Sequence, residues 1–166
     1  MATGTISAPA PLAEPNAVRS ARSENRPPRV LVADDDFEMR RFIASALRRD
    51  GCQVVEVPNG MEMLDVLASE LLFPKGNPPV DLIISDLRMP GVTGLSVLSG
   101  LQDSGWTTPF ILITGFGGPE VESQAIREGA AAVFDKPFDI DELRRTVLDL
   151  IGPSESGETN DLGGEG

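Results

Sequence analysis

Carboxylates, a hydroxyl and an ammonium group follow four short apolar runs of this sequence. Asp34 and Asp35 come after the first run, and Asp86 ends the third. Thr114 follows the fourth run, and Lys136 follows the fifth. Three carboxylates gathered in one place repel one another and need a cation when all are ionised. Oxygen ligands without Cys or His favour a hard ion, so the pattern predicts a Mg²⁺ site, with Mn²⁺ as an alternative.

The same residue types suit phosphoryl transfer, which depends on positioning and charge neutralisation. A carboxylate such as Asp86 can be the nucleophile, because aspartyl phosphate is a known type of covalent intermediate. Lys136 offers a positive charge and a donor to one phosphoryl oxygen, and Thr114 offers a hydroxyl donor to another.

Each of these residues also has an ordinary structural explanation when it is taken singly. Asp34 and Asp35 would form an acidic turn, and Asp36 is expected to cap the following helix. Thr114 would satisfy backbone at a strand end, and Lys136 would be plain surface. Their joint occurrence at four strand ends favours a shared site.

The elements that must position these residues alternate regularly between strand and helix. Continuous apolar runs without alternation are typical of strands buried on both faces of a parallel sheet. Right-handed crossovers leave few topologies for five such units. We therefore predict an α/β fold, a flavodoxin-like doubly wound five-stranded parallel sheet of order 2-1-3-4-5 with five helices. The strands are expected at 30–33, 53–57, 82–86, 110–113 and 131–134, with 53–57 at an edge because it is half polar.

The helices are expected from apolar residues at helical spacing. The five sets are Met39, Phe42, Ile43, Ala46 and Leu47; Met63, Leu64, Leu67 and Leu71; Leu95, Leu98 and Leu101; Val121, Ala125 and Ile126; and Ile140, Leu143, Val147 and Leu150. In a parallel sheet the carboxyl ends of the strands meet at one edge, so the polar residues that end them should converge.

Composition excludes several classes of function. The 166 residues carry a formal net charge of -12, which argues against a nucleic-acid-binding face. Cys52 is the one cysteine, so no intramolecular disulfide is possible, and the absence of His removes Ser-His-Asp chemistry and most zinc sites.

Low-complexity polar segments flank the predicted domain. Residues 1–28 and the acidic residues 152–166 lack a periodic apolar pattern and are expected to be disordered tails around a folded domain at 29–151. Residues 73–79 are expected to form a rigid surface loop. Without an apolar run of about 18 residues or a signal peptide, we expect no membrane contact and a cytoplasmic location.

Taken together, the motifs resemble the receiver domain of bacterial response regulators. The resemblance is carried by Val-Leu-Val-Ala-Asp-Asp-Asp at 30–36, Asp-Leu-Arg-Met-Pro-Gly at 86–91, Ile-Thr-Gly at 113–115 and Asp-Lys-Pro-Phe at 135–138. It implies that Asp86 accepts a phosphoryl group from a phosphohistidine on a sensor histidine kinase or a phosphotransfer protein.

The resemblance also implies roles for the neighbouring residues. Asp35 and Asp86 would ligate Mg²⁺ directly, Asp34 would do so through water, and the main-chain carbonyl of Arg88 would be a further ligand. Thr114 and Lys136 would bind the phosphoryl group and report it to the face made by the fourth helix, the fifth strand and the last helix.

The sequence departs from the receiver pattern in places. Receivers usually carry an aromatic residue three positions before the lysine, where this chain has Val133, and Phe134 should point to the opposite face of the sheet. Arg88 places a bulky cation beside the site, and the loop at 73–79 is longer than is usual.

The sequence thus predicts a single-domain response regulator that catalyses only its own phosphorylation and dephosphorylation and signals by protein contact. One alternative is a non-phosphorylated pseudo-receiver scaffold, for which Val133 is the support. Another is a Mg²⁺-dependent phosphohydrolase of the haloacid dehalogenase type. That class needs Asp-x-Asp on its first strand, whereas this chain has adjacent acids there and Arg88 where the second acid of Asp86-Leu87-Arg88 would stand.

Overall fold

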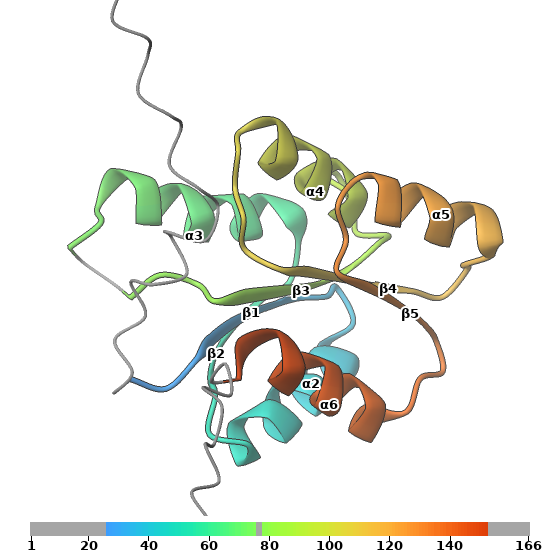
Figure 1. The fold of residues 1–166 in the computed structure, drawn as a ribbon, viewed down its shortest axis with the longest axis horizontal. Helices are drawn as coiled ribbons and strands as arrows, with labels where there is room; N and C mark the ends of the chain where they lie inside the picture. The colour runs from blue at the N-terminus through green and yellow to red at the C-terminus, as the bar shows by residue number, and fades with distance from the viewer. Residues whose placement is uncertain (1–25, 76–77, 153–166) are drawn as a thin grey trace, which may run out of the picture.

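Five short strands pair in parallel into one sheet, in the order β2-β1-β3-β4-β5 (Figure 1). The computed structural model describes residues 26–75 and 78–152. The strands are β1 (Arg29–Ala33), β2 (Gln53–Val57), β3 (Leu82–Asp86), β4 (Phe110–Thr114) and β5 (Ala132–Asp135). The predicted strand order and the flavodoxin-like fold are confirmed.

The helices cover both faces of the sheet, as Figure 1 shows. They are α2 (Phe37–Arg49), α3 (Gly60–Leu72), α4 (Gly94–Asp103), α5 (Pro119–Arg127) and α6 (Ile140–Ile151). α3, α4 and α5 lie on one face, and α2 and α6 lie on the other. The sheet therefore separates two apolar cores, and the central strands β1, β3 and β4 are buried along their whole length.

The two edge strands are more exposed than the central three. β2 is largely half-buried, which agrees with its predicted edge position. At the other edge, Val133 packs toward the core under α3, α4 and α5, whereas Phe134 packs toward the core under α2 and α6. The two side chains thus point to opposite faces, as the alternation along a strand requires.

Side-chain caps fix where the helices begin. The Asp36 carboxylate accepts hydrogen bonds from the backbone N–H groups of Glu38 and Met39, which confirms its predicted role as the cap of α2. The Asp139 carboxylate caps α6 by accepting from the N–H of Asp141. Pro119 is at the start of α5, where its missing N–H costs no hydrogen bond.

Three apolar residues that were expected on the inner faces of helices are exposed instead. They are Phe42, Leu71 and Ile126, with exposed fractions of 51%, 66% and 51%. Ile43 and Ala125 sit next to Phe42 and Ile126 and are buried, and consecutive helical residues point about 100° apart. The sheet covers one side of each helix, so neighbours at the border of the apolar stripe remain on the surface.

Residues 26–28, just before the predicted boundary at residue 29, contact the sheet region. The Arg26 guanidinium donates to both oxygens of the Asp81 carboxylate at 3.0 Å, and the Pro28 carbonyl accepts from the N–H of Gln53 at 2.8 Å. An ion pair that composition could not reveal therefore holds residues 26–28 against the start of β3. The rest of the predicted tails, 1–25 and 153–166, and residues 76–77 of the predicted loop lie outside the described residues.

Among the described residues, none of the helices has both the length and the apolar character needed to cross a lipid bilayer.

Candidate functional site

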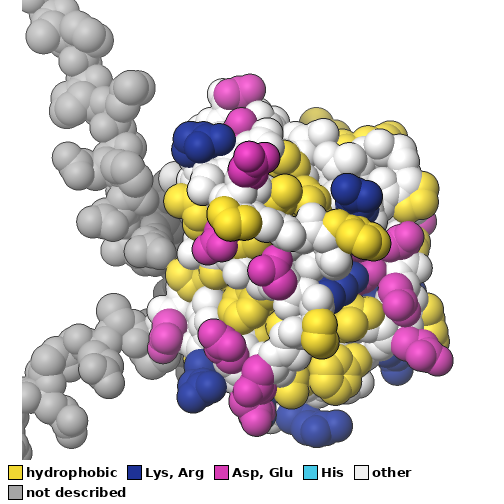
Figure 2. All heavy atoms as spheres, turned by 90° about the vertical axis from the view of Figure 1, so that its right-hand side faces the viewer, with side chains coloured by type: hydrophobic (Ala, Val, Ile, Leu, Met, Phe, Trp, Pro, Cys, Tyr) yellow, Lys and Arg dark blue, Asp and Glu magenta, His cyan; other side chains and the backbone are white. Residues whose placement is uncertain are grey.

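The predicted acidic residues meet at the carboxyl end of the sheet. One carboxylate oxygen from each of Asp34, Asp35 and Asp86 lies within 4.8 Å of the other two. Asp34 and Asp86 are buried, and Asp35 is exposed. The strands end on the right of Figure 1, and Figure 2 views that side, where acidic and hydrophobic side chains are intermingled.

Lys136 joins this cluster from the end of β5. Its Nζ lies 3.4 Å from Asp34 Oδ2 and 3.5 Å from Asp86 Oδ1. Its backbone N–H donates to the Thr114 carbonyl at 2.7 Å, which holds the end of β5 against the end of β4. One ammonium group thus faces three carboxylates, so the cluster retains negative charge for a bound cation to neutralise.

Asp34 is fixed by its own loop. Its Oδ1 accepts from the N–H of Asp36 at 2.9 Å, and its carbonyl accepts from the Arg40 guanidinium at 2.6 Å. Burial raises the pKa of the Asp34 carboxyl, against the hydrogen bond from Asp36 and the charge of Lys136, which lower it. The loop therefore holds an acid that would be more stable if a cation shared its charge.

Asp86 is the most strongly perturbed acid of the cluster. Burial, with the nearby Asp34 carboxylate, raises the pKa of Asp86 to about 6, against the opposing effect of Lys136. Its main-chain carbonyl accepts from the Ser85 hydroxyl at 2.9 Å. At neutral pH the Asp86 carboxylate is thus mostly ionised but poorly solvated, which suits a nucleophile or a metal ligand.

Thr114 lies at the same edge, at the end of the neighbouring strand. It is buried, and its hydroxyl oxygen accepts from the N–H of Phe116 at 3.2 Å. In β-sheet register it pairs with Asp135, one residue before Lys136. The structure therefore places Thr114 beside the Lys136 segment, and no acceptor for its hydroxyl proton is found in the described part of the chain.

The Arg88 side chain does not join the acidic cluster. Its guanidinium carbon lies 5.1 Å from the centroid of the Phe116 ring, a cation–π arrangement. Both residues are exposed, and Phe116 is on the loop after Thr114. The pair connects the loops that follow β3 and β4, while the role of the Arg88 carbonyl as a metal ligand stays a prediction.

Three residues that hold Asp34 and Asp86 in place were not predicted from the sequence. Arg40 holds the Asp34 carbonyl from one turn into α2, and Ser85 bonds the Asp86 carbonyl. Gly94 begins α4 against the same carbonyl, because a Cβ there would clash with Asp86 O and lie 2.7 Å from Ser85 Oγ. A buried serine inside an apolar strand was an available signal for Ser85, whereas the tight approach of Gly94 depends on tertiary packing.

Gly94 gives a test of how tightly the site is packed. Gly94→Ala is expected to lower the free energy of unfolding by about 1 to 3 kcal/mol, since the methyl group meets rigid backbone of β3. Urea unfolding followed by circular dichroism measures the change. Gly100→Ala, in the same helix with open space around it, is the matched control and should be neutral or stabilising by up to about 1 kcal/mol. Equal stability of the two variants would contradict the close contact.

The donor set fits a hard divalent cation. The possible metal ligands are carboxylate oxygens from three residues, two of them buried, and none is a soft ligand. The ammonium group of Lys136 lies beside them. The remaining groups, Lys136 and Thr114, are hydrogen-bond donors suited to an anionic oxygen. The arrangement can therefore hold a metal ion beside a nucleophilic carboxylate and bind a phosphoryl group there.

Known proteins that match this chain are response regulators and their receiver domains. Residues 30–148 match the family described as response regulator receiver domain. The chain is 29% identical over 119 residues to sporulation initiation phosphotransferase F of Bacillus subtilis, covering 72% of this chain and 90% of that protein. It is 34% identical over 113 residues to the DNA-binding transcriptional regulator NtrC of Escherichia coli, covering 68% of this chain but 22% of NtrC.

Solved structures agree with these sequence matches. The receiver domain of the Francisella response regulator 1452 aligns with a TM-score of 0.65 at 31% identity, covering 75% of this chain and 96% of that one. A response regulator receiver protein from Burkholderia phymatum aligns with a TM-score of 0.63 at 34% identity, covering 75% and 95%. With its strand order, its acidic cluster and these matches, the chain belongs to the response regulator receiver domain family.

Proposed function

We propose that this protein is a single-domain response regulator that accepts a phosphoryl group on Asp86, with Mg²⁺ bound beside it. The observation that carries the proposal is the buried Asp86 carboxylate, held between Lys136 and two further carboxylates. The family match over residues 30–148 and the match over 90% of sporulation initiation phosphotransferase F support a phosphoryl-accepting role. Signalling then proceeds by phosphorylation-dependent protein contact.

In the proposed reaction an Asp86 oxygen attacks the phosphorus of a phosphohistidine on the donor protein. The new O–P bond forms as the N–P bond breaks, and the imidazole leaves with the electron pair of that bond and is protonated. Asp35 and Asp86, with Asp34 through water and the Arg88 carbonyl, would hold Mg²⁺, which neutralises charge on the phosphoryl oxygens. Lys136 and Thr114 donate hydrogen bonds to the remaining oxygens.

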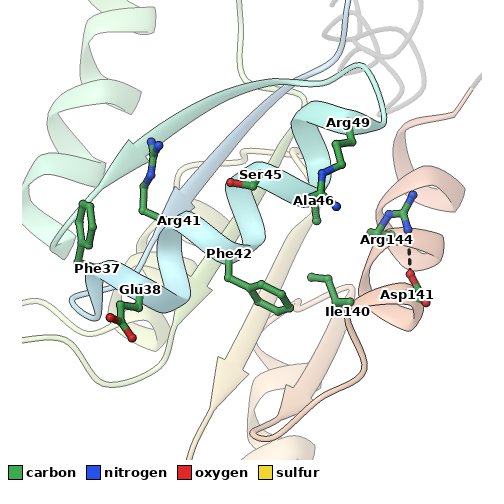
Figure 3. A pocket seen from close by; sticks show the side chains of 10 residues that line it. All are labelled: Phe37, Glu38, Arg41, Phe42, Ser45, Ala46, Arg49, Ile140, Asp141 and Arg144. Atoms are coloured by element: carbon green, nitrogen blue, oxygen red, sulfur yellow. Dashed lines mark hydrogen bonds and ion pairs between the residues drawn. The ribbon is translucent and has the colours of Figure 1, made fainter.

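The start of α2 directly follows the acidic loop, so a donor protein bound there would lie beside the site. A cleft of about 590 Å³ lies there between α2 and α6 (Figure 3). Phe42 and Ile140 point toward one another in it, and Phe37, at the start of α2, is 63% exposed. We therefore place the phosphohistidine-bearing part of the kinase or phosphotransfer protein on this cleft.

The downstream partner is proposed to bind elsewhere, on the face made by α5, β5 and α6. Lys136 directly follows β5, and its N–H donates to the carbonyl of Thr114, which directly precedes the α5 loop. A phosphoryl group that pulls on Lys136 and Thr114 would therefore shift both elements together.

Mass spectrometry of the intact protein tests the proposal. Incubation with acetyl phosphate and Mg²⁺ should add one phosphoryl group, and omission of Mg²⁺ with a chelator present should prevent the addition. A negative result would be repeated with purified histidine kinases and phosphotransfer proteins as donors. Persistent failure to take up a phosphoryl group would contradict the proposal and favour the pseudo-receiver scaffold.

Lys136 should be needed more for signalling than for phosphoryl uptake. Lys136→Ala is expected to lose most of the phosphorylation-dependent amide shift changes in α5 and β5, because the ammonium that links the phosphoryl group to β5 is gone. Two-dimensional NMR spectra before and after acetyl phosphate treatment measure this. Lys75→Ala removes the charge of an exposed lysine on the loop after α3 and should respond like the wild type. Wild-type shift changes in Lys136→Ala would refute the coupling role.

A further inference from the structure

A second groove, on the opposite side of α6 from the α2–α6 cleft, lies between α5 and the β5–α6 segment. It encloses about 510 Å³. Its apolar lining includes Ile126 of α5, Val133 of β5 and Phe138 of the loop before α6. Ile126 is 51% exposed, and Val133 and Phe138 are half-buried. The groove thus offers water-exposed apolar surface on the proposed signalling face.

Val133 contributes a small side chain to this groove. Its side chain is short and β-branched and packs toward the core under α5, whereas the next residue, Phe134, points to the other core. Phe138 is held at the side by an edge-to-face contact with Phe134, with ring centroids 6.2 Å apart. The apolar groove is therefore bounded by a fixed aromatic ring and a small side chain, a shape that accepts a large apolar side chain from outside.

The charged residues along the groove are all acidic. Glu122 of α5, Asp139 before α6 and Glu142 of α6 line it with Asp135, and no Lys or Arg is among the described residues that do so. Within the described part of the chain, none of these four carboxylates takes part in an ion pair. The groove thus combines an apolar interior with carboxylates that pair with no Lys or Arg of the described residues.

The cleft on the other side of α6 has a different charge pattern. It is lined by Arg41, Arg49 and Arg144 as well as by Glu38 and Asp141. α6 therefore separates an acidic groove from a mixed cleft that contains three arginines. A positively charged segment would be attracted to the former. It would find less free negative charge at the latter, where Arg144 is already paired with Asp50 and Asp141.

We propose that the α5–β5–α6 groove binds a basic segment of a partner protein, with one large apolar side chain packed on Val133 and Lys or Arg side chains facing Glu122, Asp139 and Glu142. The proposal deepens the proposed function, on which it rests for the claim that this face carries the signal. It specifies the chemistry of the downstream partner, and a nucleic acid is excluded because its phosphates would be repelled by the same carboxylates.

Peptide binding to the full chain, followed by NMR and fluorescence anisotropy, tests this inference. The probe is a fluorescent helical peptide with Lys and Arg on both sides of a single Phe, and its match has Glu in place of the basic residues. The basic peptide should shift amides of α5, β5 and the start of α6, and the acidic peptide should not. Glu142→Lys should raise the dissociation constant at least tenfold, whereas Asp65→Lys, an equal charge change on the exposed side of α3, should raise it less than threefold.

A substitution at Val133 tests the apolar contact in the groove. Val133→Phe fills the groove and should weaken binding at least fivefold while circular dichroism shows an intact fold. Equal weakening by Glu142→Lys and Asp65→Lys would reveal general charge attraction and overturn the proposal, as would amide shifts that map elsewhere. The assay is run on unphosphorylated protein and again after treatment with acetyl phosphate and Mg²⁺, and binding should be tighter after treatment. Specific peptide binding by a protein that takes up no phosphoryl group would refute the proposed function and leave the groove assignment standing.

Discussion

Asp86→Asn is expected to take up no phosphoryl group under conditions in which the wild type gains one. An amide oxygen is a far weaker nucleophile than a carboxylate, and the variant also loses a proposed metal ligand. Asp86 is buried, with Lys136 Nζ 3.5 Å from its Oδ1, whereas Asp35 is exposed. Asp34 is also buried and near Lys136, but its carboxylate is held by the N–H of Asp36. The measurement is the intact mass after incubation with acetyl phosphate and Mg²⁺.

The matched control for this experiment is Asp65→Asn, which makes the same chemical change at an exposed position on α3. It should be phosphorylated like the wild type. Normal labelling of Asp86→Asn would show that another residue is the acceptor. Peptide mapping of the labelled protein would then identify it, with Asp34 and Asp35 as the neighbouring carboxylates to inspect.

The substitution at Asp86 should also change the stability of the metal-free protein. Asp86→Asn is expected to raise the free energy of unfolding by about 1 to 3 kcal/mol at pH 7.5 in the presence of a chelator. Burial raises the pKa of Asp86 from 3.8 to about 6, so the native state binds this proton more tightly than the unfolded state does. The stability that protonation gives is complete below pH 3.8 and is lost as the pH rises through 6. Asparagine, which stays neutral, avoids that loss.

Thermal unfolding at several pH values checks this prediction. The advantage of the variant should shrink toward zero as the pH falls from 7.5 to 4. Saturating Mg²⁺ should raise the melting temperature of the wild type, because a ligand at a hundredfold excess over its dissociation constant adds about 2.7 kcal/mol to the free energy of unfolding. The melting temperature of the variant should rise much less. A variant that is less stable than the wild type at pH 7.5 without metal would show that Asp86 is not electrostatically strained.

Most of the fold could be predicted from the sequence, because its local signals agree with one another. Continuous apolar runs gave buried strands, and the half-polar run at Gln53–Val57 gave an edge strand. Asp36 and Pro119 marked helix starts through hydrogen bonding and ring geometry that depend on a few adjacent residues. Such signals could not tell which border residues of a helix stay exposed, as Phe42 shows, because that depends on where the sheet ends.

The residues that form the candidate site could also be predicted from the sequence. Parallel strands bring their carboxyl ends to one edge, so Asp34, Asp86 and Lys136 had to converge once the strands were assigned. Their separations and the direction of the Asp86 pKa shift were not predictable, because both depend on burial and on the register between strands.

The order of the elements and the chemical identity of the groups at their ends are therefore readable from the sequence, since both follow from local pattern. Contacts between distant segments depend on the tertiary structure. It placed Arg26 against Asp81, seated Gly94 on the Asp86 carbonyl, and opened an acidic groove over Val133. These features arise where backbone and side chains from separate elements pack together, and the local sequence pattern cannot predict such contacts.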